Sequence, residues 1–187
     1  MIFVNFFRAI WYNNNKSKRK KRMVDRLPDY ERAEGFAEMT LVQHGLRHPP
    51  VIANKIAKAM GFKILNGIFP EGKRNIAGFV DIKEKAIYVN AEDPPARRNF
   101  TIAHELGHVI LRHDFGDNYK PLYRTPIGNN EIDPQEKEAN CFAANLLVPT
   151  NLLLKYIEMP DEIVGKIFGV SKDVIKYRKL FIKRAWL

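Results

Sequence analysis

Apolar residues recur at helical spacing in four stretches of this 187-residue chain, and each stretch is bounded by residues that begin or end helices. The first stretch follows Asp29, which can cap a helix, and it ends near Gly45. Two of the others begin at prolines, as helices often do. The predicted helices cover residues 30–44, 50–60, 96–113 and 134–148.

The pattern changes between the second and third predicted helices. Short runs of β-branched and aromatic residues alternate there with polar turns, at residues 63–65, 76–80 and 86–89. These runs predict a small antiparallel sheet packed on the helices. The expected fold class is therefore α+β.

A long loop is expected after the third helix, because residues 114–133 are rich in Asn, Gly, Pro and Tyr and show no period. A loop of this length in a compact domain is usually functional or disordered. It fits the border of a cleft.

The end of the chain predicts two helices, over residues 161–168 and 172–183, joined by a turn at Gly169. This arrangement resembles a helix-turn-helix. The second helix carries basic residues that would suit phosphate contacts, namely Lys172, Lys176, Arg178, Lys179, Lys183 and Arg184. The simpler interpretation is a packed helical hairpin with a solvated basic face.

The chain length suits one domain with small appendages. We expect a basic, flexible extension over residues 1–27, a main domain over 28–158 and a C-terminal helical segment over 159–187.

The formal net charge of +10 is concentrated near the N-terminus. Six basic residues lie between positions 16 and 22, so the rest of the chain carries about +4. Such a run is more typical of a solvated tail than of a nucleic-acid-binding face. The apolar residues 1–12 are too few to span a bilayer, so we expect no stable membrane insertion; a peripheral anchor is the alternative.

A single cysteine, Cys141, excludes an intrachain disulfide and cysteine-based zinc fingers. No secretory signal is evident, because the basic residues follow the apolar N-terminal run instead of preceding it. Both features favour a reducing compartment, the cytoplasm.

Candidate chemistry lies on the third helix, in the motif His104-Glu105-Leu106-Gly107-His108. Residues four apart share a helix face, so His104 and His108 can direct both imidazoles at one zinc ion. Glu105 is rotated by about 100 degrees from His104, which lets its carboxylate act as general base on a water at the metal. The alternative is that the motif has no metal-binding role, with two histidines on a polar helix edge beside a solvated glutamate.

A third ligand is needed, and three acidic residues are available. Asp114 would require a sharp turn just after His108, where a glycine would be expected. The helix after Pro134 offers Glu136 and Glu138. Glu136 shares its face with small residues and with Asn140, a potential partner for a ligand, whereas Glu138 could be a surface residue.

Two blocks of the sequence, residues 99–108 and 136–149, resemble the ImmA/IrrE family of metallopeptidases in the same order. The similarity extends over about residues 51–149. It implies a zincin-like fold for the main domain, with an edge strand offered to an extended substrate. It also implies a thermolysin-like zinc site of two histidines and one glutamate, which makes Glu136 the third ligand beside His104 and His108.

These observations predict a zinc-dependent, site-specific endopeptidase with Glu105 as its general base. The resemblance implies a protein substrate such as a transcriptional repressor of a mobile element or a stress response. A DNA-binding regulator with a vestigial metal site and a metal-stabilised interaction module are the alternatives. Residues of a type able to stabilise an oxyanion are His113, Tyr88, Tyr119, Tyr123 and Arg98.

Overall fold

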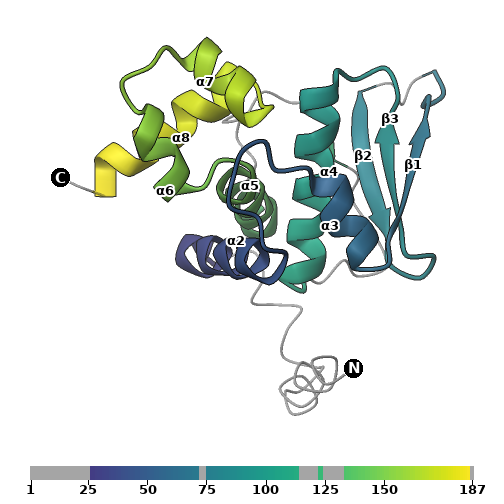
Figure 1. The fold of residues 1–187 in the computed structure, drawn as a ribbon. Helices are drawn as coiled ribbons and strands as arrows, with labels where there is room; N and C mark the ends of the chain where they lie inside the picture. Colours follow the sequence, from purple (N-terminus) through teal and green to yellow (C-terminus); the bar gives the residue numbers. More distant parts are fainter. Residues whose placement is uncertain (1–25, 72–74, 114–121, 124–132, 186–187) are drawn as a thin grey trace.

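The computed structural model describes residues 26–71, 75–113, 122–123 and 133–185 (Figure 1). In chain order its elements are α2 (Tyr30–Gln43), α3 (Ala53–Ala59), β1 (Lys63–Gly67), β2 (Ile76–Asp81), β3 (Ala86–Asn90), α4 (Pro95–Ile110), β4 (Leu122–Tyr123), α5 (Pro134–Leu147), α6 (Thr150–Leu153), the 3-10 turn η1 (Leu154–Tyr156), α7 (Asp161–Phe168) and α8 (Lys172–Ala185). The predicted α+β class is confirmed.

The sheet has the strand order β1-β3-β2-β4 and is mixed, which corrects the expectation of a purely antiparallel sheet. β2 and β3 form an antiparallel hairpin, but β1 runs parallel to β3, with Lys63 opposite Ala86. The chain passes from β1 to β2 and leaves a place between them that β3 fills. Periodicity identifies strands but carries no information about which strand inserts between two others.

β4 is a second correction, because it lies inside the predicted loop. Its two residues pair antiparallel with β2, with Ile76 opposite Tyr123. The remainder of the predicted loop, residues 114–121 and 124–132, lies outside the described residues.

α4 occupies the centre of the molecule. One of its sides contacts β2 and β3 and the other contacts α5 and α2 (Figure 1). Nine consecutive residues, Phe100 to His108, are therefore buried. A helix covered on both sides can bury polar side chains that a surface helix would expose to water.

The predicted helix boundaries are close to those observed, with two corrections. α2 is capped as expected, since the Asp29 side chain accepts a hydrogen bond from the Arg32 amide at 2.9 Å. α3 begins at Ala53, three residues after the predicted start at residue 50, and Ile52 before it is 38% exposed. α4 ends at Ile110, three residues before the predicted end at His113.

The C-terminal helices α7 and α8 lie where they were predicted, and Gly169 between them adopts a left-handed conformation with φ 67°. α6 and η1, which precede them, were not predicted. Val164, Phe168 and Ile175 belong to the same buried cluster as the apolar residues of α4 and α5. The proposed boundary at residue 159 stays a prediction.

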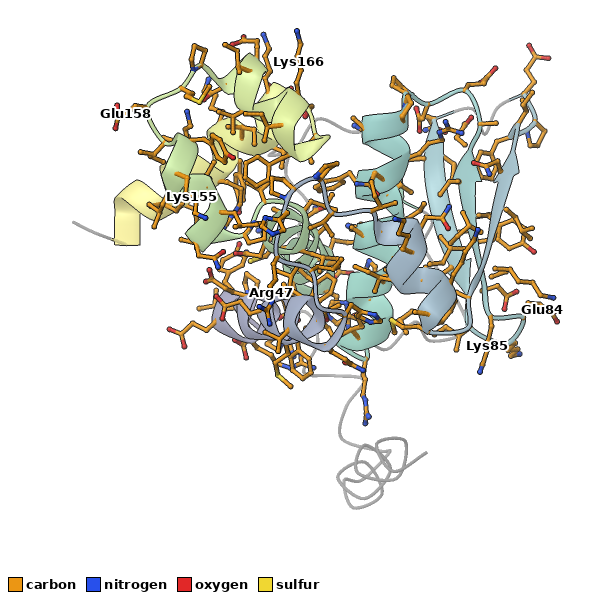
Figure 2. All side chains as sticks on the ribbon, viewed as in Figure 1. Arg47, Glu84, Lys85, Lys155, Glu158 and Lys166 are labelled. Atoms are coloured by element: carbon orange, nitrogen blue, oxygen red, sulfur yellow. The ribbon has the colours of Figure 1, made fainter. Side chains whose placement is uncertain are left out.

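Charged side chains are distributed over the surface of the described part. Arg47, Glu84, Lys155 and Lys166 are exposed and lie in different parts of the fold (Figure 2). None of the helices within the described ranges is long and apolar enough to cross a membrane. The predicted N-terminal extension lies almost entirely outside the described residues.

Candidate metal centre

The two histidines of the α4 motif meet as their spacing predicts. The Nε2 atoms of His104 and His108 lie 2.9 Å apart, and the ring centroids are 4.7 Å apart. Both residues are buried, at 0% and 5% exposure. Two nitrogen ligand atoms thus point at one place in the interior.

Glu136 completes the cluster from the first turn of α5. Its Oε2 lies 3.3 Å from His104 Nε2, and its Oε1 lies 3.3 Å from His108 Nε2. The start of α5 is held by Asp133, whose side chain accepts a hydrogen bond from the Gln135 amide at 2.9 Å. Among the described residues, these three form the group that could hold a metal ion.

Small residues allow α4 and α5 to approach closely enough for this contact. A Cβ added to Gly107 would lie 3.0 Å from Phe142 Cδ1 and 3.2 Å from the Cα of Ala139. A larger residue at either face would separate the helices. The glycine inside the histidine motif therefore helps to bring Glu136 to the two imidazoles.

The spacing of the cluster fits zinc. Zinc lies about 2.0–2.2 Å from nitrogen and oxygen ligands, which places tetrahedral ligand atoms roughly 3.3–3.6 Å from one another. The observed separations of 2.9 and 3.3 Å need only small movements of the rings. Two imidazoles and one carboxylate are also a donor set that zinc accepts, with room for a fourth ligand.

The electrostatics of the cluster favour a bound cation. Burial alone would raise the pKa of Glu136, but hydrogen bonds and charge from His104 and His108 outweigh it and hold that pKa well below the usual range. Burial disfavours a protonated His104, yet contact with the Glu136 carboxylate raises its pKa. Glu136 therefore keeps a negative charge beside two nitrogen ligand atoms.

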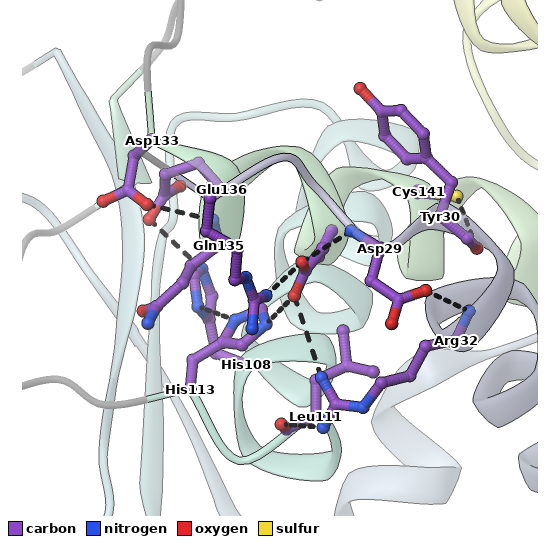
Figure 3. Close-up of polar contacts among 12 residues, drawn as sticks. Asp29, Tyr30, Arg32, His108, Leu111, His113, Asp133, Gln135, Glu136 and Cys141 are labelled. Carbon is purple, nitrogen blue, oxygen red and sulfur yellow. Dashed lines mark hydrogen bonds and ion pairs between the residues drawn. The ribbon is translucent and has the colours of Figure 1, made fainter. Parts of the chain in front are cut away.

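Each histidine is held from behind by a different partner. His104 Nδ1 lies 2.9 Å from the side-chain oxygen of Asn140, in agreement with the role expected for that residue. His108 Nδ1 lies 2.9 Å from His113 Nδ1, and His113 Nε2 lies 3.0 Å from Glu138 Oε2 (Figure 3). Second partners of this kind orient metal-binding imidazoles.

Two of these positions differ from the sequence-based expectations. Glu138 is fully buried and is not a surface residue. His113, considered as an oxyanion donor, lies on the side of His108 away from Glu136. Its position could have been found only from the turn after α4, which returns the chain toward His108.

The other sequence candidates have varied positions. Glu105 is 1% exposed on α4, and its role as general base stays a prediction. Tyr88 stacks on Phe79 with ring centroids 4.6 Å apart, and Arg98 donates a hydrogen bond to Asn66. The remaining candidates, Asp114, Tyr119 and the side chain of Tyr123, lie outside what the structure describes.

A turn follows α4 without a glycine. Leu111 keeps a right-handed conformation with φ -75°, and Arg112 directly after it is left-handed with φ 53°. A non-glycine residue is modestly strained in this conformation, and favourable packing around the helix end can compensate for the strain.

The chain is similar to a phage protein and to a solved structure of a bacterial regulator. "Uncharacterized immunity region protein 2" of Bacillus phage phi105 is 30% identical over 113 residues, which cover 56% of this chain and 66% of the phage protein. The solved structure of a Mycobacterium tuberculosis transcriptional regulator superposes with a TM-score of 0.57 at 18% identity, over 79% of this chain and 46% of that one. The second likeness shows a shared fold, and the chain spans less than two thirds of either protein.

The family profile of peptidase M78, described as the IrrE N-terminal-like domain, matches residues 61–179. The match includes all three residues of the candidate metal centre and both blocks that resemble ImmA/IrrE proteins. The chain belongs to this family of IrrE N-terminal-like, peptidase M78 domains.

Proposed function

We propose that the chain is a zinc-dependent endopeptidase that cleaves a regulatory protein, such as a transcriptional repressor, at a specific site. The observation that carries this proposal is the convergence of His104 and His108 of α4 with Glu136 of α5. Glu105, which is buried, lies on α4 next to His104. Membership of the peptidase M78 family supports it.

The proposed roles follow from the chemistry of each side chain. His104, His108 and Glu136 would hold the zinc ion. When bound, zinc lowers the pKa of water and polarises a peptide carbonyl. Glu105 would accept the proton of the attacking water and then deliver it to the departing amine. Its burial would keep the carboxylate in a poorly solvated place, where electrostatic effects are strong.

The names of the relatives support a regulatory substrate. One belongs to a phage immunity region and the other is a transcriptional regulator. From these two contexts we infer a regulatory protein of the same cell, such as a repressor, as the substrate class. The lone buried thiol of Cys141 supports the cytoplasm as the compartment.

The test compares the wild type with Glu105→Gln. The variant should bind zinc as the wild type does and lose at least about 100-fold of its cleavage rate, because the general base is removed and the ligands remain. Proteomic comparison of cells that express either protein would identify fragments produced by the wild type alone. Identical fragments in both, at equal rates, would contradict the proposal.

A DNA-binding regulator is the second candidate, supported by the helical hairpin of α7 and α8. The structure corrects part of the expected basic surface: Arg178 is buried, and Lys179 pairs with Asp161 at 2.9 Å. Lys172 and Lys176 are exposed. If the chain is a regulator of this kind, its DNA binding should depend on salt concentration and should persist in the Glu105→Gln variant.

A further inference from the structure

A chain of three buried side chains leads away from the candidate metal centre. His108 Nδ1 contacts His113 Nδ1 at 2.9 Å, and His113 Nε2 contacts Glu138 Oε2 at 3.0 Å (Figure 3). The exposed fractions of the three residues are 5%, 7% and 0%. Water therefore does not compete for these contacts.

The carboxylate at the end determines the direction of every hydrogen bond in the chain. An ionised carboxylate only accepts, so the Nε2 of His113 must carry the proton that it donates to Glu138. A neutral imidazole has one donor and one acceptor, which leaves His113 Nδ1 as an acceptor. A neutral His108 that donates from Nδ1 has its lone pair on Nε2, the atom that a metal ion would bind in place of the contact with Glu136.

His113 is suited to this neutral role. It is 7% exposed, and each of its two ring nitrogens lies within 3.0 Å of a buried partner. A neutral ring in this position can accept from one nitrogen while donating from the other.

Glu138 is held in place by donors from the segment that leads into α2. Its Oε1 accepts a hydrogen bond from the backbone amide of Asp29 at 2.7 Å and forms an ion pair with Arg26. Arg32 lies 3.8 Å from its Oε2. Donors and positive charge on these sides orient the carboxylate, so that Oε2 is available to His113.

The end of α4 places His113 by a local backbone mechanism. Arg112 takes the left-handed conformation, and the His113 amide donates to the His108 carbonyl at 3.0 Å. This closing turn brings the second residue after the helix cap back over the last helical turn. In this chain, the two residues that it brings together are both histidines.

We propose that Glu138 and His113 are positioning residues, which set the tautomer and the orientation of His108 so that its Nε2 is available to the metal. The inference rests on the proposed zinc site. It concerns residues beyond the ligands and the general base, and it makes the segment at Arg26 and Asp29 part of the support of the centre.

Glu138→Gln provides the sharpest test, because it changes one atom and keeps the shape. The donors from Asp29 and Arg26 require an oxygen, so the new amide nitrogen would face His113 and donate to it. His113 would then donate from Nδ1, and His108 would have to place its proton on Nε2, where the metal binds. We expect a 10–100-fold loss of zinc affinity in competition with a chelator.

A pair of variants at His113 tests the same relay without changing Glu138. His113→Asn keeps an acceptor near His108 Nδ1 and should retain most of the zinc affinity, whereas His113→Leu removes it and should match Glu138→Gln. The visible spectrum of the cobalt-substituted protein should be changed in His113→Leu and close to the wild type in His113→Asn. Because this pair is judged on its own, it also decides the matter if Glu138→Gln does not fold.

Arg178→Met is the matched structural control, because Arg178 is also buried and hydrogen-bonded at an end of α5 but lies away from the cluster. It should lower the thermal stability without changing zinc affinity. Wild-type affinity in both Glu138→Gln and His113→Leu would overturn this inference and leave the zinc site intact. A wild type that binds no zinc would overturn the proposed function and this inference with it.

Discussion

Charged groups pack against both ends of α5, but they serve different roles there. At the N-terminal end, Glu136 and Glu138 present carboxylates to imidazoles and to donors of the α2 segment. At the C-terminal end, the Arg178 guanidinium donates to the Val148 carbonyl at 3.1 Å and to the Thr150 hydroxyl at 2.7 Å. The signs of the charges agree with the helix dipole, which favours anions at the first turn and cations at the last.

The difference lies in what the partners can still bind. Burial lowers the pKa of Arg178, yet its donors are used on neutral oxygens, so this end joins helices and offers no ligand atoms. At the other end, one carboxylate and two imidazoles converge with lone pairs. Burial of charge therefore has two outcomes on one helix: packing at one end and a potential ligand set at the other.

The strongest way to break the comparison is Glu136→Ala. Removal of a ligand should lower zinc affinity by at least about 100-fold, beyond the 10–100-fold typical of partners that only orient a ligand. Metal content after dialysis and chelator competition would measure it. Glu84→Ala is the control, because that carboxylate is exposed at the turn between β2 and β3. Equal zinc retention in both variants would refute the ligand role of Glu136.

Arg178→Met tests the other end. The Val148 carbonyl and the Thr150 hydroxyl would lose their buried donor, and unfolding in denaturant should require about 3 kcal/mol less free energy. Lys176 lies on α8, as Arg178 does, but it is exposed. Lys176→Met should therefore change the stability by less than about 0.5 kcal/mol. Similar stabilities in the two variants would show that the buried guanidinium contributes no more than a surface lysine.

Gly107→Ala tests the contact between α4 and the middle of α5. The added methyl group would lie 3.0 Å from Phe142 and 3.2 Å from Ala139, so we expect a net loss of roughly 1–2 kcal/mol of stability and weaker zinc binding. Gly35→Ala in α2 is the matched control, because no atom lies within 4 Å of its added Cβ.

The control should gain stability, by about 1 kcal/mol, from the higher helix propensity of alanine. Thermal and denaturant unfolding of both variants would measure the contrast. If Gly107→Ala also gained stability and kept its zinc affinity, close approach of the helices would not be a requirement of the site.

The smallest effect is expected at Cys141, which lies between the two ends. Burial raises the pKa of its thiol to about 11. Between about pH 9 and 11 the unfolded chain releases the thiol proton while the folded chain retains it, so stability falls as pH rises. The wild type should lose on the order of 1 kcal/mol more than Cys141→Ala across this range. Parallel pH dependences in urea unfolding would contradict the assignment.

Local sequence signals predicted the helices that carry the candidate ligands. The helix caps, the prolines and the spacing of apolar residues placed α4 and α5 within a few residues of their observed positions. Helical geometry then predicted that His104, His108 and Glu136 could meet, and the resemblance selected Glu136 over Glu138. Each of these inferences depends on neighbours within one helix, which sequence spacing describes well.

Contacts between distant segments were not predictable in the same way. The burial of Glu138 depends on Asp29 and Arg26, more than 100 residues earlier in the chain. The parallel pairing of β1 and the short strand β4 depend on where the chain returns to the sheet. The periodicity of apolar residues within one element does not indicate which distant residues become these partners.

By itself, the sequence determined the two helices and the spacing of the candidate ligands on them, because helix formation and side-chain spacing are local properties. Only the tertiary structure decided that Glu138 is a buried acceptor, that His113 lies behind His108 and that Arg178 faces inward. The physical reason is that burial and the direction of a hydrogen bond belong to pairs of residues. Such pairs form only when segments far apart in the chain come together.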